Sequence, residues 1–163
     1  MRAQNELLEY MHEPLPPISE QRRLIYRPSK GQVIYFYKLI NHSVFDDQLC
    51  LPDIELMARC RKYWGMCYGN YIKVPHRNTF CHIRLMDKFY CRPWLISILA
   101  HEMVHQYQWD IVGPQRLEEG KERMLSHGPT FFQYRDRMAE HGISLKVAHR
   151  RGRWFKHQDF FKC

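Results

Sequence analysis

Apolar residues at helical spacing predict a first main helix over residues 31–42. The apolar positions, at i, i+3, i+4 and i+7, are Val33, Phe36, Tyr37 and Ile40. Before them, Ser29 is followed three residues later by Gln32, which is the pairing of a capping box. Because the apolar residues fall on one face, we expect this helix to pack on a sheet and to have a structural role.

Three short segments after this helix are predicted as strands. They cover residues 54–58, 64–74 and 81–85. In the last segment, polar and apolar side chains alternate from His82 to Leu85, which is typical of a strand with one buried face. Gly65 and Gly69 interrupt the middle segment, so its bounds are poorly defined by the pattern.

Two more helices are predicted, over residues 93–107 and 129–141. Pro93 suits the first turn of the earlier one. Its apolar residues recur at helical spacing and are Leu95, Ile98, Leu99, Met103 and Tyr107. In the later helix we expect Phe132 and Met138 to face inward, with Tyr134 or Arg135 beside them.

The helix at 93–107 carries an HExxH motif, from His101 to His105. Residues four apart lie on one face of a helix, so His101 and His105 can present ring nitrogens to one metal ion. Catalytic zinc takes three protein ligands and leaves the fourth position to water. The candidate third ligand is His127, in the segment SHGP. Glu102 lies about 100° round the helix from His101, where it can act as general base beside the metal.

The alternative is a chance HExxH match with purely structural side chains. The apolar helix argues against it, because two histidines and a glutamate buried there would be costly without a partner. A metal ion is the usual partner. We therefore interpret the motif as a catalytic zinc site.

These residues resemble the SprT-like metalloproteases, the group that contains Spartan. The family pairs an HEMxH helix with a later HGPxF, and this chain has HEMVH at 101–105 and HGPTF at 127–131. Upstream, residues 45–52 (FDDQLCLP) resemble the family segment between the first helix and the strands. The resemblance covers about residues 30–145.

The resemblance implies an α+β, zincin-like single domain. It would contain an N-terminal helix, a small sheet of three to four strands, the HExxH helix and a following helix. It also implies one zinc ion held by His101, His105 and His127, with Glu102 as the catalytic glutamate. In zinc peptidases of this type an edge strand beside the metal pairs with the extended substrate backbone. The sequence does not indicate which strand that is.

Two features depart from the family pattern. The connection between His105 and His127 is long and holds a charged stretch, EEGKER, at 118–123. We interpret it as a solvated connector or as a segment that selects substrates. The chain has no CxxC pair, so we expect no C-terminal zinc ribbon and a single zinc ion. Small relatives without the ribbon resemble proteases carried by phages and mobile elements.

Length and composition predict one domain of 163 residues. We divide it into an N-terminal arm (1–29), a metalloprotease domain (30–145) and a C-terminal tail (146–163). No apolar run approaches the roughly 20 residues that cross a bilayer, and the first residues lack a signal-peptide pattern. We therefore expect a cytoplasmic protein, free or associated with DNA. The six cysteines are irregularly spaced and are expected to be reduced.

The C-terminal tail interleaves cations with aromatic residues. The candidate nucleic-acid ligands are Arg150, Arg151, Arg153, Trp154 and Lys156. Cations suit phosphates and aromatic rings suit unstacked bases, a combination found in proteins that bind single strands. The formal net charge of +8 agrees with an anionic partner. The alternative is that the aromatic residues pack the tail onto the domain while the cations stay solvated.

Together these patterns predict a zinc-dependent endopeptidase that acts on DNA-bound or DNA-crosslinked proteins. Its partners would be a protein substrate and single-stranded DNA, and no membrane association is expected. The sequence does not indicate an oligomeric state. The alternatives are a non-catalytic, zinc-stabilised DNA-binding module, a hydrolase of small amides, and a phage or mobile-element protease with a specific host or virion target. Glu102 argues against the first alternative, because a structural zinc site is normally closed by a fourth protein ligand. Tyr107 and Tyr134 are the nearest candidates by position to stabilise the oxyanion, and neither is assigned.

Overall fold

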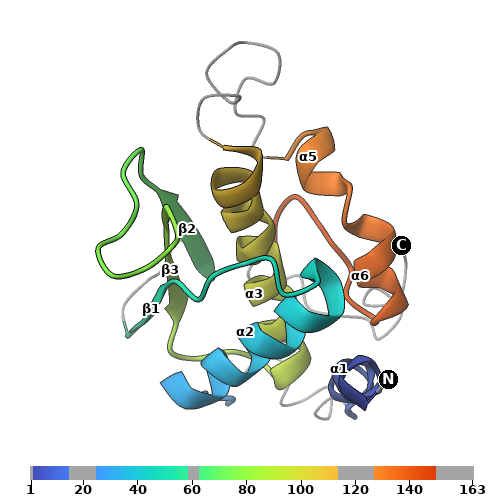
Figure 1. Cartoon of the computed structure of the whole chain (residues 1–163). Helices are drawn as coiled ribbons and strands as arrows, with labels where there is room; N and C mark the ends of the chain where they lie inside the picture. Colours follow the sequence, from blue (N-terminus) through green and yellow to red (C-terminus); the bar gives the residue numbers. More distant parts are fainter. Residues whose placement is uncertain (1, 15–24, 59–62, 114–126, 150–163) are drawn as a thin grey trace.

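The computed structural model describes residues 2–14, 25–58, 63–113 and 127–149. In chain order the elements are α1 (Arg2–Met11), α2 (Lys30–Phe45), β1 (Asp53–Met57), β2 (Gly65–Gly69), β3 (Cys81–Met86), α3 (Arg92–Tyr107), the π-helix η1 (Gln108–Val112), α5 (Pro129–Phe132) and α6 (Arg135–Glu140) (Figure 1). This arrangement confirms the predicted α+β class and the small sheet. The charged connector at 118–123 lies outside the described residues.

The described strands form one mixed sheet in the order β1-β3-β2. β1 runs parallel to β3, and β2 runs antiparallel to it. The predicted alternation is confirmed in β3: Ile83 and Leu85 are fully buried against the helices, whereas Arg84 on the outer face pairs with Glu55 at 2.8 Å. The sheet therefore has one apolar face toward α3 and one polar outer face.

The hydrogen bonds between β2 and β3 determine which backbone groups of β2 face outward at the sheet edge. The Met86 amide donates to the Trp64 carbonyl at 2.9 Å, and the Asn70 amide donates to the Phe80 carbonyl at 2.9 Å. In an antiparallel ladder these hydrogen-bonded positions alternate along the strand. The backbone groups of Gly65, Cys67 and Gly69 therefore point away from β3. β2 is an edge strand of the described sheet.

Helix α2 begins at the predicted capping box. The Gln32 amide donates to the Ser29 hydroxyl at 3.2 Å, and the Ser29 amide donates to the Gln32 side chain at 2.8 Å. The predicted apolar face is buried throughout. The helix continues to Phe45, beyond the predicted end at 42, because Asp46 provides a left-handed cap with φ 53°. Asn41 then bonds both backbone groups of Leu49, which holds the loop toward β1.

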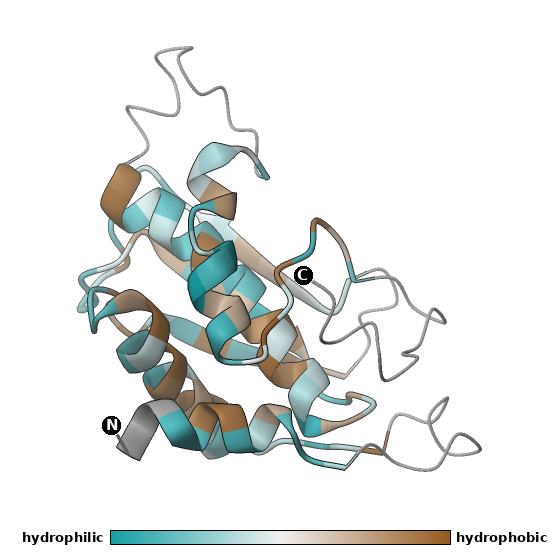
Figure 2. Cartoon of the chain, turned by 90° about the vertical axis from the view of Figure 1, so that its right-hand side faces the viewer, coloured by the Kyte–Doolittle hydropathy of each residue, from teal (hydrophilic) through white to brown (hydrophobic). Residues whose placement is uncertain are grey.

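Helix α1 belongs to the main core although it lies in the predicted arm. Leu7 is 0% exposed and Met11 is 2% exposed, and both join the core cluster built on α2 and α3. Figures 1 and 2 show α1 lying across the end of this helical layer. The division of the chain into arm, domain and tail remains a prediction.

The prediction of a single helix over residues 129–141 is wrong. The segment is divided into α5 and α6, because Tyr134 leaves helical geometry with φ −91° and ψ 2°. Met138 is fully buried as predicted, but the fully buried phenylalanine is Phe131, while Phe132 is only partly buried. The break allows Phe131 to pack on the histidines and Tyr134 to pack on Phe45, with ring centroids 4.6 Å apart.

Two further observations concern the described residues only. No helix in them is both long enough and apolar enough to cross a membrane. The cysteines at positions 50, 67, 81 and 91 are free thiols, as predicted, and Cys60 and Cys163 lie outside the described residues.

Candidate metal centre

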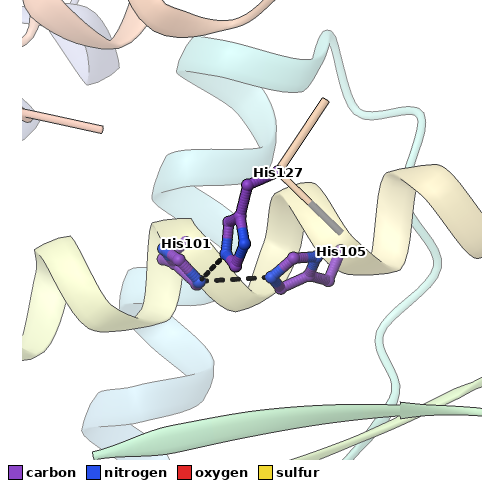
Figure 3. Close-up of side chains that lie close together, drawn as sticks. All are labelled: His101, His105 and His127. Carbon is purple, nitrogen blue, oxygen red and sulfur yellow. Dashed lines mark hydrogen bonds between the residues drawn. The ribbon is translucent and has the colours of Figure 1, made fainter. Parts of the chain in front are cut away.

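Helix α3 brings two of the predicted ligands together at its C-terminal end. The helix begins with Pro93 in its first turn, and it is buried along most of its length. His101 and His105 project from one face of it, one turn apart (Figure 3). Their Nε2 atoms lie 3.1 Å apart. Helical spacing and burial of α3 thus place both imidazoles at the same point.

His127 reaches the same point from a different part of the chain. It stands just before Gly128 and Pro129, which begin α5. Its Nε2 atom lies 3.3 Å from the Nε2 atom of His101. The ring of Phe131, which is fully buried, has its centroid 4.7–4.9 Å from those of all three histidines. The candidate ligand atoms of the three histidines all lie within 4.8 Å of one another.

Hydrogen bonds at the far ring nitrogens orient two of the imidazoles. His101 Nδ1 bonds the Lys146 carbonyl at 2.9 Å, and His105 Nδ1 bonds the Gln108 side-chain oxygen at 2.8 Å. Because both partners are oxygens, each Nδ1 carries the proton and donates it. The Nε2 atom of each neutral ring therefore presents its lone pair to the other histidines. This is the tautomer that binds metals.

Electrostatics keeps these imidazoles neutral. Burial and, to a smaller extent, the neighbouring histidines lower the pKa of His101 to about 2. Burial also lowers the pKa of His105 to about 4, with a smaller contribution from His127. The pKa of His127 is lowered for the same reason. Protonation, which would block metal binding, is thus disfavoured at neutral pH.

The cluster fits a bound cation. Two lone pairs 3.1 Å apart repel one another unless a positive charge lies between them. Two nitrogens bound tetrahedrally to one zinc ion at about 2.0–2.1 Å lie about 3.3 Å apart. The observed Nε2 separations of 3.1 and 3.3 Å agree with that value. His101, His105 and His127 can therefore hold a metal ion.

Glu102 points from the same helix toward β2. A Cβ atom added at Gly65 would lie 3.0 Å from the Glu102 side chain, so only glycine leaves room for it there. Glu102 is 6% exposed. Burial raises the pKa of its carboxyl to about 8, and a hydrogen bond from the Cys67 backbone acts in the opposite direction. The carboxyl is thus held between the histidine helix and the edge strand.

Some site residues were missed by sequence reasoning. Gln108 bonds His105 and also donates to the Thr130 hydroxyl at 3.0 Å, which ties η1 to α5; its spacing of three residues from His105 is the signal that would have found it. His149 packs on Trp94 and His101, with ring centroids 5.0 and 5.5 Å away. Among the described residues, neither of its buried ring nitrogens has a hydrogen-bond partner. No sequence pattern indicates this position.

Other predicted residues are not brought to this site. Tyr107 and Tyr134 pack on each other, with ring centroids 4.9 Å apart, and on Phe45. Tyr107 is two residues after His105 and so projects roughly 200° away around the helix. The predicted nucleic-acid ligands, namely Arg150, Arg151, Arg153, Trp154 and Lys156, lie outside the described residues.

Comparison with known proteins does not assign the chain to a family. No protein-family model matches the chain. No curated protein matches it significantly either. The chemistry of the site is therefore argued from its own residues.

Proposed function

We propose that this chain is a zinc-dependent endopeptidase that acts on proteins bound or crosslinked to DNA. The observation that carries the proposal is the convergence of three imidazole Nε2 atoms, with the buried carboxyl of Glu102 on the same helix as two of them. A structural zinc site normally has four protein ligands, whereas a catalytic one keeps a position for water or substrate. Three ligands with an adjacent acid are typical of hydrolysis.

The donor set favours zinc. Three neutral imidazoles suit a borderline-soft ion such as zinc, whereas magnesium and calcium prefer oxygen ligands. Non-haem iron sites of oxygenases commonly use two histidines and one carboxylate. Glu102 does not complete such a set, because its side chain is directed at Gly65 and Cys67 of β2. The three histidines remain as the ligands.

The residues of the chain have separate roles in the proposed reaction. Zinc bound there would polarise the scissile carbonyl and acidify the attacking water. Glu102 would accept a proton from that water and donate it to the leaving amine. Lys146, through its carbonyl, and Gln108 hold His101 and His105 in the required tautomer. Phe131 would exclude solvent from one side of the imidazoles.

The substrate would lie along β2. The backbone groups of Gly65, Cys67 and Gly69 point away from β3. The Cys67 amide donates to Glu102, so the proposed pairing uses the groups of Gly65 and Gly69 and the Cys67 carbonyl. An extended peptide can add to such an edge through main-chain hydrogen bonds, which provide affinity with little dependence on side chains. We therefore propose β2 as the strand that pairs with substrate. A protein substrate is favoured over a small amide because β2 offers an extended edge.

Association with DNA is supported by composition and by the family resemblance. The net charge of +8 favours an anionic partner. The tail residues with alternating cations and aromatic rings are the proposed contact to single strands. A zinc protease directed at a specific host or virion protein would use the same catalytic residues.

The test compares wild type with Glu102→Gln on a DNA-binding protein, with and without single-stranded DNA. We expect Glu102→Gln to lower the cleavage rate by about 10²–10⁴-fold while zinc content stays unchanged. Glu140→Gln is the matched control, because Glu140 is exposed on α6. His127→Ala should lose most of the zinc. Equal cleavage by wild type and Glu102→Gln would exclude Glu102 as the base.

The DNA arm of the experiment separates the two substrate classes. Cleavage that requires single-stranded DNA supports action on DNA-bound proteins. Cleavage indifferent to DNA would remove the DNA-directed part of the proposal and leave the peptidase. Zinc bound without any cleavage would favour the non-catalytic binding module.

A further inference from the structure

We propose that a groove on the outer side of β2 is a subsite for a bulky apolar side chain of the peptide substrate. This inference rests on the proposed peptidase function and adds a preference that main-chain pairing alone does not supply. The groove has a volume of about 790 Å³. Its apolar part is formed by Tyr68, Tyr71, Ile72, Val74 and Pro75.

The side chains that form this groove are unusually exposed for their type. Ile72 is 81% exposed, Tyr71 is 62% exposed and Tyr68 is 40% exposed. They come from β2 and from the connection between β2 and β3, the green loop beside the sheet in Figure 1. Several large apolar side chains gathered at one concave surface are typical of a binding site rather than of ordinary surface.

An aromatic contact connects this groove to the helix that carries the histidines. Trp109 lies in η1, four residues after His105, and packs directly on Gly69 of β2. A Cβ atom at Gly69 would lie 1.8 Å from the Trp109 ring, so this packing requires glycine. The Tyr71 ring packs on the same indole in a T-shaped contact, with ring centroids 5.7 Å apart. The wall of the groove is therefore held in place relative to the metal centre.

The geometry of strand pairing leads a substrate side chain into the groove. Residues opposite each other on paired strands project to the same face of the sheet. Tyr68 pairs with His82 on the outer face, whereas Cys67 faces inward with Ile83. In a peptide paired with the free edge of β2, the residue opposite Tyr68 would thus project to the outer face, against the groove. Alternate residues would face the histidine helix.

The charges around the groove favour a peptide over a nucleic acid. Arg84 is paired with Glu55 at 2.8 Å and also lies over the Tyr68 ring, 5.0 Å from its centroid. Lys73 bonds the Asn78 side chain. Glu55 lies on the same outer face of the sheet as His82 and Arg84. These cations are already engaged, and the adjacent carboxylate would repel phosphates.

The experiment first identifies a cleaved sequence in a protein digested by wild type. Peptides of that sequence are then made with phenylalanine or alanine at each position within four residues of the cut. At one position we expect phenylalanine to raise kcat/KM by about 10-fold or more over alanine. Ile72→Ser and Tyr71→Ser should reduce this preference about 5-fold or more, with zinc content unchanged. Ile25→Ser is the control, because Ile25 is an exposed isoleucine outside the groove, 50% exposed.

A binding measurement separates failure of this inference from failure of the proposed function. Fluorescence anisotropy of labelled, uncleaved phenylalanine and alanine peptides is measured with Glu102→Gln and with Glu102→Gln/Ile72→Ser. Binding that depends on phenylalanine and Ile72, without cleavage by wild type, would retain the groove as a peptide site and reject the peptidase. Cleavage by wild type that is indifferent to the apolar residue and to both groove substitutions would reject the groove alone. A loss of oligonucleotide binding in Ile72→Ser and Tyr71→Ser, with unchanged peptide preference, would overturn the inference in favour of a nucleic-acid surface.

Discussion

Helix α3 and the start of η1 contribute to two clusters of buried polar side chains. The two clusters differ in the partners that their polar atoms find. One is the amide network, centred on Gln106, which is 0% exposed. Its amide donates to the Cys50 carbonyl at 2.7 Å and to Asp110 at 2.8 Å, and it accepts from the Tyr37 hydroxyl at 2.9 Å. The other is the histidine cluster, formed by His101, His105 and His127, whose Nε2 atoms face one another.

The clusters differ in how their polar atoms are satisfied. In the amide network each donor of the Gln106 side chain meets an acceptor, and Asp110 also accepts from Thr79 and from the Phe80 amide at 2.7 Å. Such a network is satisfied by the protein itself and holds α3, η1 and β3 together. In the histidine cluster acceptors meet acceptors. A metal ion would satisfy that arrangement, and the three histidines can hold one.

The largest expected effect is the dependence of stability on zinc. With free zinc a thousandfold above Kd, we expect the free energy of unfolding of wild type to rise by about 4 kcal/mol, or roughly 10 °C in Tm. His127→Ala should lose most of this increase, whereas His42→Ala, on an exposed part of α2, should keep it. Thermal unfolding with zinc and with a chelator measures it. An equal response of wild type and His127→Ala would place the ion elsewhere.

The carboxyl of Glu102, on the same helix as His101 and His105, provides a test by pH. Its pKa is about 8 in the folded protein against 4.5 for the ordinary group. Between these values the folded state binds more protons than the unfolded state, so this residue makes stability fall as pH rises. In metal-free protein we expect Glu102→Gln to be more stable than wild type by about 4 kcal/mol near pH 8.

Comparing wild type with Glu102→Gln separates the contribution of Glu102 to the pH dependence of stability from that of the histidines. His101 and His105 have lowered pKa values and destabilise both proteins below pH 6.5. Their contribution cancels in the difference, which should vanish near pH 4.5. Urea unfolding across this pH range provides the measurement, with Glu140→Gln as control. A difference that grows toward acid would show that Glu102 is ionised in the folded protein.

Removing the centre of the amide network tests the claim that it is purely structural. Gln106→Leu leaves Asp110 without one donor, and we expect a loss of about 2 kcal/mol in the free energy of unfolding. Gln133→Leu, at an exposed glutamine of the same type, should change it by less than about 0.5 kcal/mol. Zinc affinity should remain at the wild-type value. If Gln106→Leu weakens zinc binding as strongly as it lowers stability, the two clusters are not independent.

The smallest expected effect concerns Gln108, which connects to the histidine cluster by a single hydrogen bond. Gln108→Leu removes the oxygen that orients His105, so zinc affinity should fall about 10–100-fold, or about 1.4–2.7 kcal/mol. Competition with a chromogenic chelator measures this directly. Gln108→Glu keeps an acceptor for His105 but loses the amide N–H that donates to Thr130, and should recover most of the affinity. If Gln108→Glu does not restore the zinc affinity, the effect would be assigned to the packing of α5 instead.

Patterns within one helix turn were predicted well. The capping box of α2, its apolar face and the shared face of His101 and His105 all follow from a period of 3.6 residues. The break between α5 and α6 was not predicted, since apolar residues at helical spacing continue across it. β2 is also shorter than predicted, because its flanking residues from Asn70 onward turn into the loop that forms the groove.

The sequence by itself determined the helix that carries the first two histidines, the acid between them and the nature of the third donor. These depend on residue type and short spacing, which act locally along the chain. The tertiary structure showed that the predicted His127 meets them, and it alone decided that Lys146 orients His101 and that β2 is the edge strand next to Glu102. These contacts join residues far apart in sequence, and packing of the whole core selects them, so no local pattern could specify them.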